Sequence, residues 1–389
     1  MNAIVLEGDW APRADFPLSN AQRAARKATG SAVWRNPRFS ATQIPDPTPG
    51  AREVVVRVRA CGVCGSDTHC YETDEAGYIL FSGPVRLPVV PGHEYAGEVV
   101  AVGREVRHLR VGDLVAAEGM LNCGVCEACR IGRPNQCPEL EMVGFSSPGA
   151  YADFITVEER FCWKLNGLAD RLGDPVKALE LGALVEPIAC SYNGIFVSGR
   201  GLRPGEHVAV HGCGPIGLGA IALARAAGAA TILAFDVSVS RLELALAMGA
   251  DEAHDPNRLR AEGSSPAEEI LRATGGWGAE LHVESAGAAQ FTMPQIERSM
   301  APGGTMVYLG RTGQHAPVLL DSLVTGASAI VGSRGHVGGG CFPRIIRLLE
   351  RGALPVEPMI TSRMAFGDFM QAIAQSCTRV DGKIMLRYD

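Results

Sequence analysis

The segment that most constrains the fold lies mid-chain, where a predicted strand runs directly into a glycine-rich turn and then a helix. The strand is expected over Glu206–His211 and the helix over Leu218–Ala227. A G-x-G-x-x-G turn in this context is typical of dinucleotide binding, because its glycines let the backbone approach a pyrophosphate and the helix N-terminus offers free amides. The candidate cofactor-binding residues of the turn are Gly212, Gly214, Pro215, Ile216 and Gly217.

A carboxylate follows at the spacing that ribose recognition needs. The next predicted strand, Thr231–Phe235, ends at Asp236, nineteen residues past Gly217. A carboxylate there can accept hydrogen bonds from the adenosine ribose hydroxyls and repels a 2′-phosphate, which predicts NAD as the cofactor. Arg241 keeps NADP open as an alternative, because a nearby arginine can accommodate that phosphate.

Helical and strand patterns alternate from this point to Ser333. Six predicted strands joined by helical crossovers indicate a doubly wound parallel sheet, so the fold class is α/β. The further strands are expected at Glu252–His254, Glu280–Glu284, Gly304–Leu309 and Ala329–Ser333, and the helices at Ser238–Met248, Pro266–Thr274 and Gln290–Met300.

The first third of the chain has a different pattern. Val54–Ala60 and Tyr95–Val102 alternate apolar and polar residues and are rich in β-branched side chains, which predicts strands. A polar excursion over residues 9–40 carries one possible helix, Asn20–Thr29, and has no residue that suggests chemistry. This part is therefore expected to be β-rich, with its functional groups on loops.

Two of these loops combine metal-ligand types. Cys64, His93 and the carboxylate of Glu94 are the kinds of ligand that a catalytic zinc uses while keeping one position open. The hydroxyl of Ser66 and the imidazole of His69 could carry a proton away from an alcohol. Taken alone, either loop is more often structural, with a buried cysteine and a turn. The prediction of a catalytic zinc site therefore depends on the rest of the chain.

Four cysteines in the spacing C-x2-C-x2-C-x7-C predict a second metal site. They are Cys123, Cys126, Cys129 and Cys137. Four thiolates can surround one tetrahedral zinc and staple a loop, leaving no position for substrate. An iron–sulfur cluster is the alternative, although its usual last gap is three residues rather than seven.

One further carboxylate is a candidate metal ligand or base. Glu186 directly precedes Pro187 at the end of the apolar segment Ala178–Val185, which is predicted to be helical. A solvated carboxylate is unusual in that position. The alternative is an ordinary helix end at the surface.

Composition limits the possible partners and the compartment. A net charge of −6 argues against nucleic-acid or membrane partners, and the sequence has no run of about 18 apolar residues. The N-terminus lacks a basic and then apolar secretory pattern. The twelve cysteines are therefore expected to meet a reducing environment, which predicts a cytoplasmic protein with cysteines as metal ligands.

Taken together, these motifs resemble the zinc-dependent medium-chain alcohol and polyol dehydrogenases along essentially the whole chain. The resemblance implies a GroES-like catalytic domain over 1–190 and 336–389, with a structural zinc lobe at 119–140, and a Rossmann domain over 191–335. It also implies homodimers or homotetramers. The pair Glu186-Pro187, where alcohol dehydrogenases proper carry a cysteine, is similar to the sorbitol and threonine dehydrogenase branch.

The same resemblance implies a role for each site residue. Zinc would be held by Cys64, His93 and Glu94, with Glu186 as an alternate ligand or one reached through water. Asp67 would orient His93. Ser66, the nicotinamide ribose and His69 would form the proton relay. The implied reaction is reversible hydride transfer between NAD and a secondary alcohol, with one catalytic and one structural zinc.

A closer likeness is to the scyllo-inosose dehydrogenases, which implies a small-molecule cyclitol or polyol substrate. It rests on Gly30–Trp34, Thr73–Leu80 and Gly332–His336. An aminocyclitol or a threonine-like amino alcohol is the alternative substrate, and a non-catalytic dinucleotide-binding protein is a remote one. Candidate substrate contacts are Tyr78, Arg334 and His336.

Overall fold

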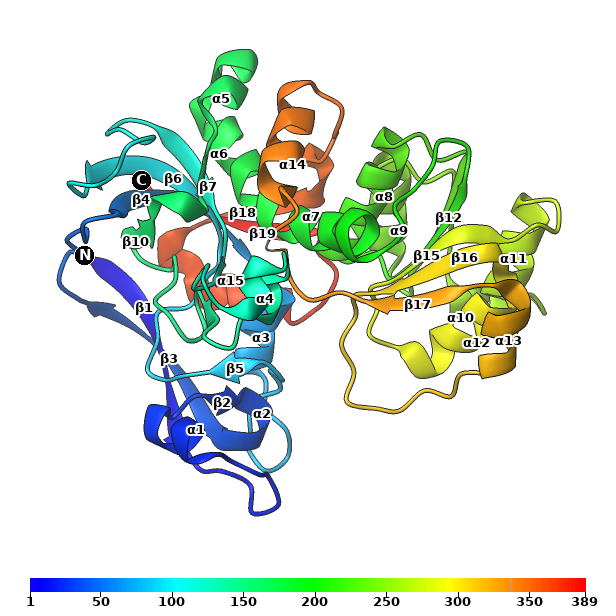
Figure 1. Cartoon of the computed structure of the whole chain (residues 1–389), viewed down its shortest axis with the longest axis horizontal. Coiled ribbons are helices and arrows are strands. Elements are labelled where there is room, and N and C mark those ends of the chain that lie inside the picture. Colours follow the sequence, from blue (N-terminus) through cyan, green and yellow to red (C-terminus); the bar gives the residue numbers. More distant parts are fainter. Residues whose placement is uncertain (337) are drawn as a thin grey trace. The chain divides into compact units, whose positions relative to one another are not determined.

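The computed structural model describes residues 1–336 and 338–389, which divide into two compact units (Figure 1). The first unit is Met1–Glu186 with Ser362–Arg379 and Lys383–Asp389, and the second is Pro187–Thr361 with Val380–Gly382. The second unit extends past residue 335 because the chain returns to the first only at Ser362. The domain boundaries given above stay predictions.

A seven-stranded sheet forms the centre of the first unit, in the order β11-β7-β6-β4-β19-β18 with β10 also paired to β4. Alternate side chains of its strands enter a core that also holds Tyr151 and Phe369. The two predicted strands, Val54–Ala60 and Tyr95–Val102, are confirmed with small extensions as β4 Glu53–Val63 and β6 Glu94–Val102. The other strands of the sheet are β7 Leu114–Ala117, β10 Phe154–Glu158, β11 Cys162–Lys164, β18 Ile360–Ala365 and β19 Lys383–Arg387.

The N-terminal excursion folds as a small lobe of the first unit (Figure 1, blue). Strands β1 (Asn2–Trp10) and β3 (Trp34–Gln43) pair antiparallel, and β2 (Ala28–Thr29) pairs with β5 (Pro84–Val85). The expected helix over Asn20–Thr29 is shorter than predicted. It is α1, Asn20–Ala25, and it ends because Arg26 adopts a left-handed conformation with φ 45°. A four-residue helix, α2 (Gly30–Val33), follows.

The predicted helix Ala178–Val185 is interrupted at Leu184, between the end of one helix and the first residue of the next. The first, α6 (Pro175–Ala183), begins where Asp174 accepts a hydrogen bond from the Lys177 amide at 3.1 Å. The second, α7 (Val185–Tyr192), carries Glu186 in its first turn. Among the described residues no single helix could cross a membrane, and one bent pair, Pro175–Ala183 with Val185–Ser198, meets the length and composition criteria together.

The second unit contains the predicted six-stranded parallel sheet, in the order β14-β13-β12-β15-β16-β17. This confirms the doubly wound topology. The strands are β12 His207–His211, β13 Thr231–Phe235, β14 Glu252–His254, β15 Ala279–Glu284, β16 Met300–Tyr308 and β17 Ala329–Gly332. The helices are α8 Pro215–Ala226, α9 Val239–Ala247, α10 Pro256–Ala261, α11 Pro266–Ala273, α12 Ala289–Ser299, α13 Leu320–Gly326 and α14 Cys341–Glu350.

Two buried histidines stack on neighbouring strands of this sheet. The rings of His211 and His282 have centroids 5.6 Å apart, and Nε2 of His211 lies 3.3 Å from Nδ1 of His282. The carbonyl of Ser299, 3.3 Å from Nε2 of His282, can only accept, so His282 carries its proton there and accepts from His211. Burial lowers the pKa of His282 to about 4 and holds the pKa of His211 well below its usual value.

We therefore expect the stability of the chain to fall as pH is lowered from about 6.5 towards 4. In this window the unfolded chain protonates these histidines and the folded chain does not, so stability rises with pH. For His282 the difference, 6.5 − 4 pKa units, corresponds to about 3 kcal/mol at the acid limit. Thermal denaturation across this range should show a flatter pH slope in His282→Gln and an unchanged slope in the exposed control His315→Gln. Equal slopes in both variants would contradict the prediction.

Candidate metal and nucleotide sites

The ends of two paired strands bring the first set of ligand atoms together. β4 runs into Cys64, the N-cap of α3 (Gly65–Tyr71), and β6 begins at Glu94, which lies opposite Gly62 of β4. The Cys64 sulfur, a ring nitrogen of His93 and a carboxylate oxygen of Glu94 lie within 4.8 Å of one another. A thiolate, an imidazole and a carboxylate at this separation fit a single zinc ion.

The imidazole of His93 is oriented by a carboxylate behind it. Its Nδ1 faces Oδ1 of Asp67 at 3.7 Å, and its Nε2 is 3.4 Å from the Ser66 hydroxyl. Both Nδ1 of His93 and Oδ1 of Asp67 are buried without a hydrogen-bond partner. Burial opposes a charge on His93, but Asp67 and then Cys64 raise its pKa well above the usual value. The ring is thus placed in a strongly negative environment that suits a cation.

A buried lysine meets Glu94. The Lys383 ammonium, from β19, donates to the two Glu94 carboxylate oxygens at 2.7 and 2.6 Å and to the carbonyl of Val63 at 3.1 Å. The side chains are 0% and 1% exposed. Burial lowers the pKa of Lys383, but Glu94 more than compensates, so the pKa is raised and the lysine is charged. No motif in the sequence indicated this role for Lys383.

Glu186, also in the first unit, acts electrostatically on this cluster but is not one of the three residues whose ligand atoms lie within 4.8 Å of one another. Its side chain is buried in the first turn of α7, and its charge raises the pKa of both His93 and Glu94. Both oxygens of Glu94 already accept hydrogen bonds from Lys383. Whether Glu94 or Glu186 binds the zinc directly therefore stays a prediction.

The relay candidates lie on one side of α3. Ser66 is partly buried and next to the His93 ring, whereas His69 is exposed on its own unit. Residues three apart on a helix share a face, so Ser66 and His69 lie on the same side of α3, and their role as a proton relay stays a prediction. The backbone carbonyl of His69 accepts hydrogen bonds from the amides of Leu80 and Phe81 at 2.8 and 3.0 Å.

The four cysteines of the predicted structural site converge around one point. The sulfur pairs Cys126–Cys129, Cys123–Cys137, Cys126–Cys137 and Cys123–Cys129 are 3.5, 3.6, 3.8 and 4.0 Å apart. Four sulfurs at about 2.3 Å from a tetrahedral zinc would be about 3.8 Å apart. The distances fit one ion, because an iron–sulfur cluster would lie between the sulfurs and hold them farther apart.

The glycine turn of the second unit has the backbone shape that phosphate binding needs. Gly212 has φ 93°, and a Cβ there would sit 2.6 Å from the Ala286 amide nitrogen. A Cβ at Gly217 would sit 1.8 Å from the Gly212 carbonyl oxygen. A Cβ at Gly214, the N-cap of α8, would meet only Nη1 of Arg241, at 3.8 Å. A turn of this shape before a helix N-terminus is suited to binding a pyrophosphate.

Asp236 is held rigidly beside that turn. Its carboxylate accepts hydrogen bonds from the amides of Cys213 at 2.7 Å and Ser238 at 2.8 Å. Arg241 donates from Nε and Nη2 to the carbonyl of Asp381 at 3.3 Å. The carboxylate is therefore positioned at the end of β13, while a backbone carbonyl engages the nearby guanidinium.

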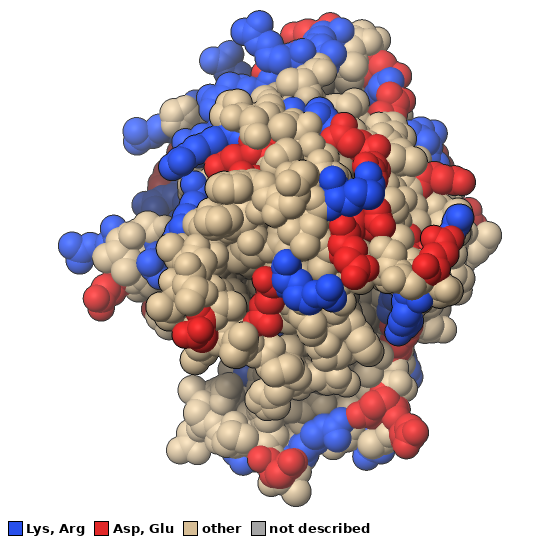
Figure 2. Space-filling view, turned by 90° about the vertical axis from the view of Figure 1, so that its right-hand side faces the viewer, with Lys and Arg blue, Asp and Glu red and all other residues tan. Residues whose placement is uncertain are grey.

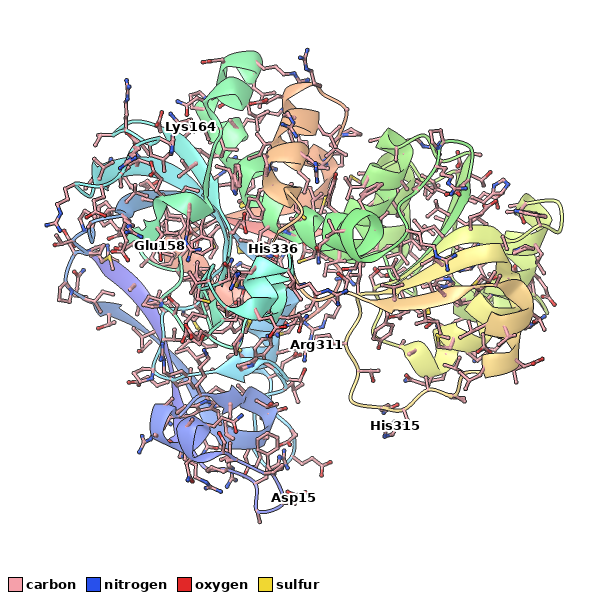
Figure 3. All side chains as sticks on the ribbon, viewed as in Figure 1. Asp15, Glu158, Lys164, Arg311, His315 and His336 are labelled. Carbon is pink, nitrogen blue, oxygen red and sulfur yellow. The ribbon has the colours of Figure 1, made fainter. Side chains whose placement is uncertain are left out.

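The three candidate substrate contacts fall into two groups. Tyr78 lies in the first unit, where its hydroxyl donates to the Ala11 carbonyl at 2.8 Å and Arg13 covers its ring at 3.9 Å, an arrangement typical of a structural residue. Arg334 and His336 follow β17 in the second unit, where Figure 3 labels His336. His336 is buried, with Cys190 Sγ 3.9 Å from its Nδ1.

Comparisons with known proteins agree with this architecture. Family models match an alcohol dehydrogenase GroES-like domain at residues 50–167 and a zinc-binding dehydrogenase at residues 215–351. Scyllo-inosose 3-dehydrogenase of Thermotoga maritima is 37% identical, covering 90% of this chain and 91% of that protein. L-threonine 3-dehydrogenase of Symbiobacterium thermophilum is 32% identical, covering 95% of this chain and 98% of that protein. A solved Thermotoga maritima alcohol dehydrogenase structure gives a TM-score of 0.93 at 34% identity, with 99% of each chain covered.

The chain therefore belongs to the zinc-dependent medium-chain dehydrogenases, with a GroES-like domain and a Rossmann sheet. It is an oxidoreductase that uses zinc and a nicotinamide nucleotide on a small-molecule alcohol. Within the family, the predicted likeness to the scyllo-inosose dehydrogenases is confirmed as a similarity of sequence.

Proposed function

We propose that the protein transfers hydride between NAD and a ring carbon of a cyclitol or a related polyol. The observation that carries the reaction type is the cluster of Cys64, His93 and Glu94 in the first unit. The substrate class is supported by the 37% identity to a scyllo-inosose 3-dehydrogenase. NAD is favoured over NADP because Asp236 presents a fixed carboxylate and the Asp381 carbonyl engages Arg241.

Each site residue has a distinct task in this reaction. Bound zinc supplies a Lewis acid for the alcohol oxygen, and bound NAD supplies the hydride acceptor. Cys64 and His93 would hold the metal together with a carboxylate of Glu94 or Glu186. Ser66 takes the hydroxyl proton and passes it towards His69, which reaches solvent on its own unit.

Lysine and carboxylate charges balance this site. Lys383 neutralises Glu94, so a thiolate and one further carboxylate offset the charge of a divalent ion. Without Lys383 the site would carry an additional buried negative charge. This charge would favour protonation of a carboxylate, and a protonated carboxyl group is a poor metal ligand.

An amino alcohol is the second candidate substrate, supported by the 32% identity to an L-threonine 3-dehydrogenase. Both substrates are secondary alcohols and use the same zinc and relay. They differ in the amine, which needs an acidic or acceptor group in the pocket.

A non-catalytic dinucleotide-binding protein is disfavoured, because every residue of the predicted relay and metal set is present.

The test is NADH formation or consumption with a panel of myo-inositol, scyllo-inosose, aminocyclitols, sorbitol and L-threonine. Turnover of a cyclitol at least about tenfold faster in kcat/KM than of the other alcohols supports the proposal. Preference for L-threonine or an aminocyclitol would select the second candidate. No turnover of any panel member, with two zinc ions and NAD bound, would contradict catalysis by this site on these substrates.

Replacing Asp236 with alanine is expected to raise KM for NAD and to narrow the preference over NADP. The carboxylate would no longer accept ribose hydrogen bonds, and its repulsion of a 2′-phosphate would be lost. Losing one charged hydrogen-bonded contact costs about 1.5–3 kcal/mol, or about ten- to hundredfold in KM. Asp236→Asn is the matched control, since it keeps an acceptor oxygen for the Cys213 amide. An unchanged NAD to NADP ratio in both variants would remove Asp236 from the ribose site.

A homodimer or homotetramer and a cytoplasmic location stay predictions. A net charge of −6 and the intermixed acidic and basic side chains over the central part of the face in Figure 2 favour a small-molecule substrate over nucleic acid or membrane. Sedimentation of the purified chain would measure the oligomeric state directly.

A further inference from the structure

A buried tyrosine hydroxyl contacts the carboxylate behind the His93 imidazole. The hydroxyl of Tyr151 donates to Oδ2 of Asp67 at 2.7 Å, with the Gly62 carbonyl as a longer second acceptor at 3.3 Å. The Cys64 amide donates to the same Oδ2 at 3.0 Å. Burial raises the pKa of Tyr151 well above its usual value, so the phenol stays protonated and remains a donor.

These two donors determine which oxygen faces the imidazole. Because Oδ2 of Asp67 is occupied by Tyr151 and Cys64, the other oxygen, Oδ1, is turned towards Nδ1 of His93 at 3.7 Å. An imidazole that presents Nδ1–H to a carboxylate presents Nε2 as a lone pair on its opposite side. That lone pair is the one a metal ion needs.

Tyr151 also supports the loop that carries His93. Its backbone amide donates to the Pro91 carbonyl at 2.9 Å, and the Ala150 amide donates to the Gly92 carbonyl at 2.8 Å. Its ring lies where a Cβ on Gly92 would come within 2.7 Å, so only glycine fits directly before His93. The ring also packs on Phe369, with centroids 4.8 Å apart.

We infer that Tyr151 is a positioning residue for the catalytic metal, acting through its hydroxyl on Asp67 and through its ring on the Gly92–His93 loop. This inference rests on the proposed function, since it assumes that His93 is a metal ligand. No motif in the sequence indicated the role, because Tyr151 lies 84 residues from Asp67 in an ordinary strand-like segment.

The variant Tyr151→Phe separates the hydroxyl from the ring. It keeps the packing on Gly92 and Phe369 and removes only the donor to Asp67. The matched control is Tyr388→Phe, which removes the hydroxyl of a partly buried tyrosine that packs against the same core and donates to the Ala150 carbonyl at 2.8 Å. Zinc is replaced by cobalt(II) in both variants and in the wild type. The cobalt affinity of each metal site, the visible absorption spectrum and the melting temperature are then measured for all three proteins.

We expect Tyr151→Phe to weaken cobalt binding at the Cys64 site about ten- to hundredfold and to shift its visible bands, as for other residues that orient a metal-binding histidine. The four-cysteine site serves as an internal reference and should be unchanged, as should both sites in Tyr388→Phe. In an Asp67→Asn background the Tyr151→Phe effect should shrink, because the two residues act in one chain of contacts.

Three results would overturn the inference. One is unchanged cobalt binding in Tyr151→Phe, and another is equal weakening of both metal sites. The third is the same weakening in Tyr388→Phe. A separate measurement tests the proposed function on which this inference rests. If the metal content of Cys64→Ser equals that of the wild type, Cys64 is not a metal ligand, and both the proposed function and the inference are contradicted.

Discussion

Replacing Cys64 with serine is expected to lower kcat at least about a thousandfold and to release one of two bound zinc ions. A serine hydroxyl remains protonated where a thiolate would bind, so the metal loses one of its few protein ligands. Loss of a Lewis acid removes several kcal/mol of transition-state stabilisation, and about 4 kcal/mol is a thousandfold in rate. The melting temperature should change little, because Cys64 is a partly exposed N-cap residue.

Cys126→Ala is the matched control, because it removes a thiol from the other site. It should also release one zinc, but its main effect should be a lower melting temperature, since a four-thiolate zinc staples its loop. Zinc analysis, kcat and thermal denaturation of the two variants therefore distinguish a catalytic from a structural metal. Retained turnover in Cys64→Ser, or an unchanged melt in Cys126→Ala, would contradict the respective assignment.

Replacing Lys383 with methionine is expected to lower the free energy of unfolding by about 3–5 kcal/mol. The substitution conserves the length of the side chain but leaves the carboxylate of Glu94 buried without its cation. Removing one partner of a buried ion pair is far more costly than removing both, because an uncompensated charge remains. Urea denaturation monitored by fluorescence would measure the loss.

Two further variants test this explanation. Glu94→Gln combined with Lys383→Met should recover much of the lost stability, since no buried charge is left. Lys164→Met removes a lysine that pairs with Asp113 at 2.8 Å while 46% exposed, and should cost less than about 1 kcal/mol (Lys164 is labelled in Figure 3). If Lys383→Met were as mild as Lys164→Met, the buried pair would not be a stabilising contact.

The parts of the site that sequence reasoning could identify are local. The turn over Gly212–Gly217 was predictable because the strand, the glycines and the helix follow one another directly. The four cysteines lie within one loop, so their spacing alone indicates a shared metal. The alternating patterns that predict the sheet strands of both units are likewise read within a few residues, and those strands are confirmed.

The parts that could not be predicted depend on distant contacts. Lys383 meets Glu94 across 289 residues of sequence, and a lysine at the start of an apolar strand gives no hint of its partner. The end of α1 at Arg26 was missed because a left-handed residue other than glycine has no clear sequence signal. Tyr78 stays a predicted substrate contact, and the hydrogen bond from its hydroxyl to the Ala11 carbonyl, 67 residues away, had no signal in the sequence.

The placement of β19 also bears on how the protein is made in the cell. A ribosome synthesises Cys64, His93 and Glu94 early, but the cation for Glu94 emerges only after the whole second unit. Until then β4 lacks its neighbour β19 and exposes a strand edge, the kind of surface that chaperones cover. The second unit is nearly continuous in sequence and can fold during translation, whereas the metal site of the first must await the strand that carries Lys383.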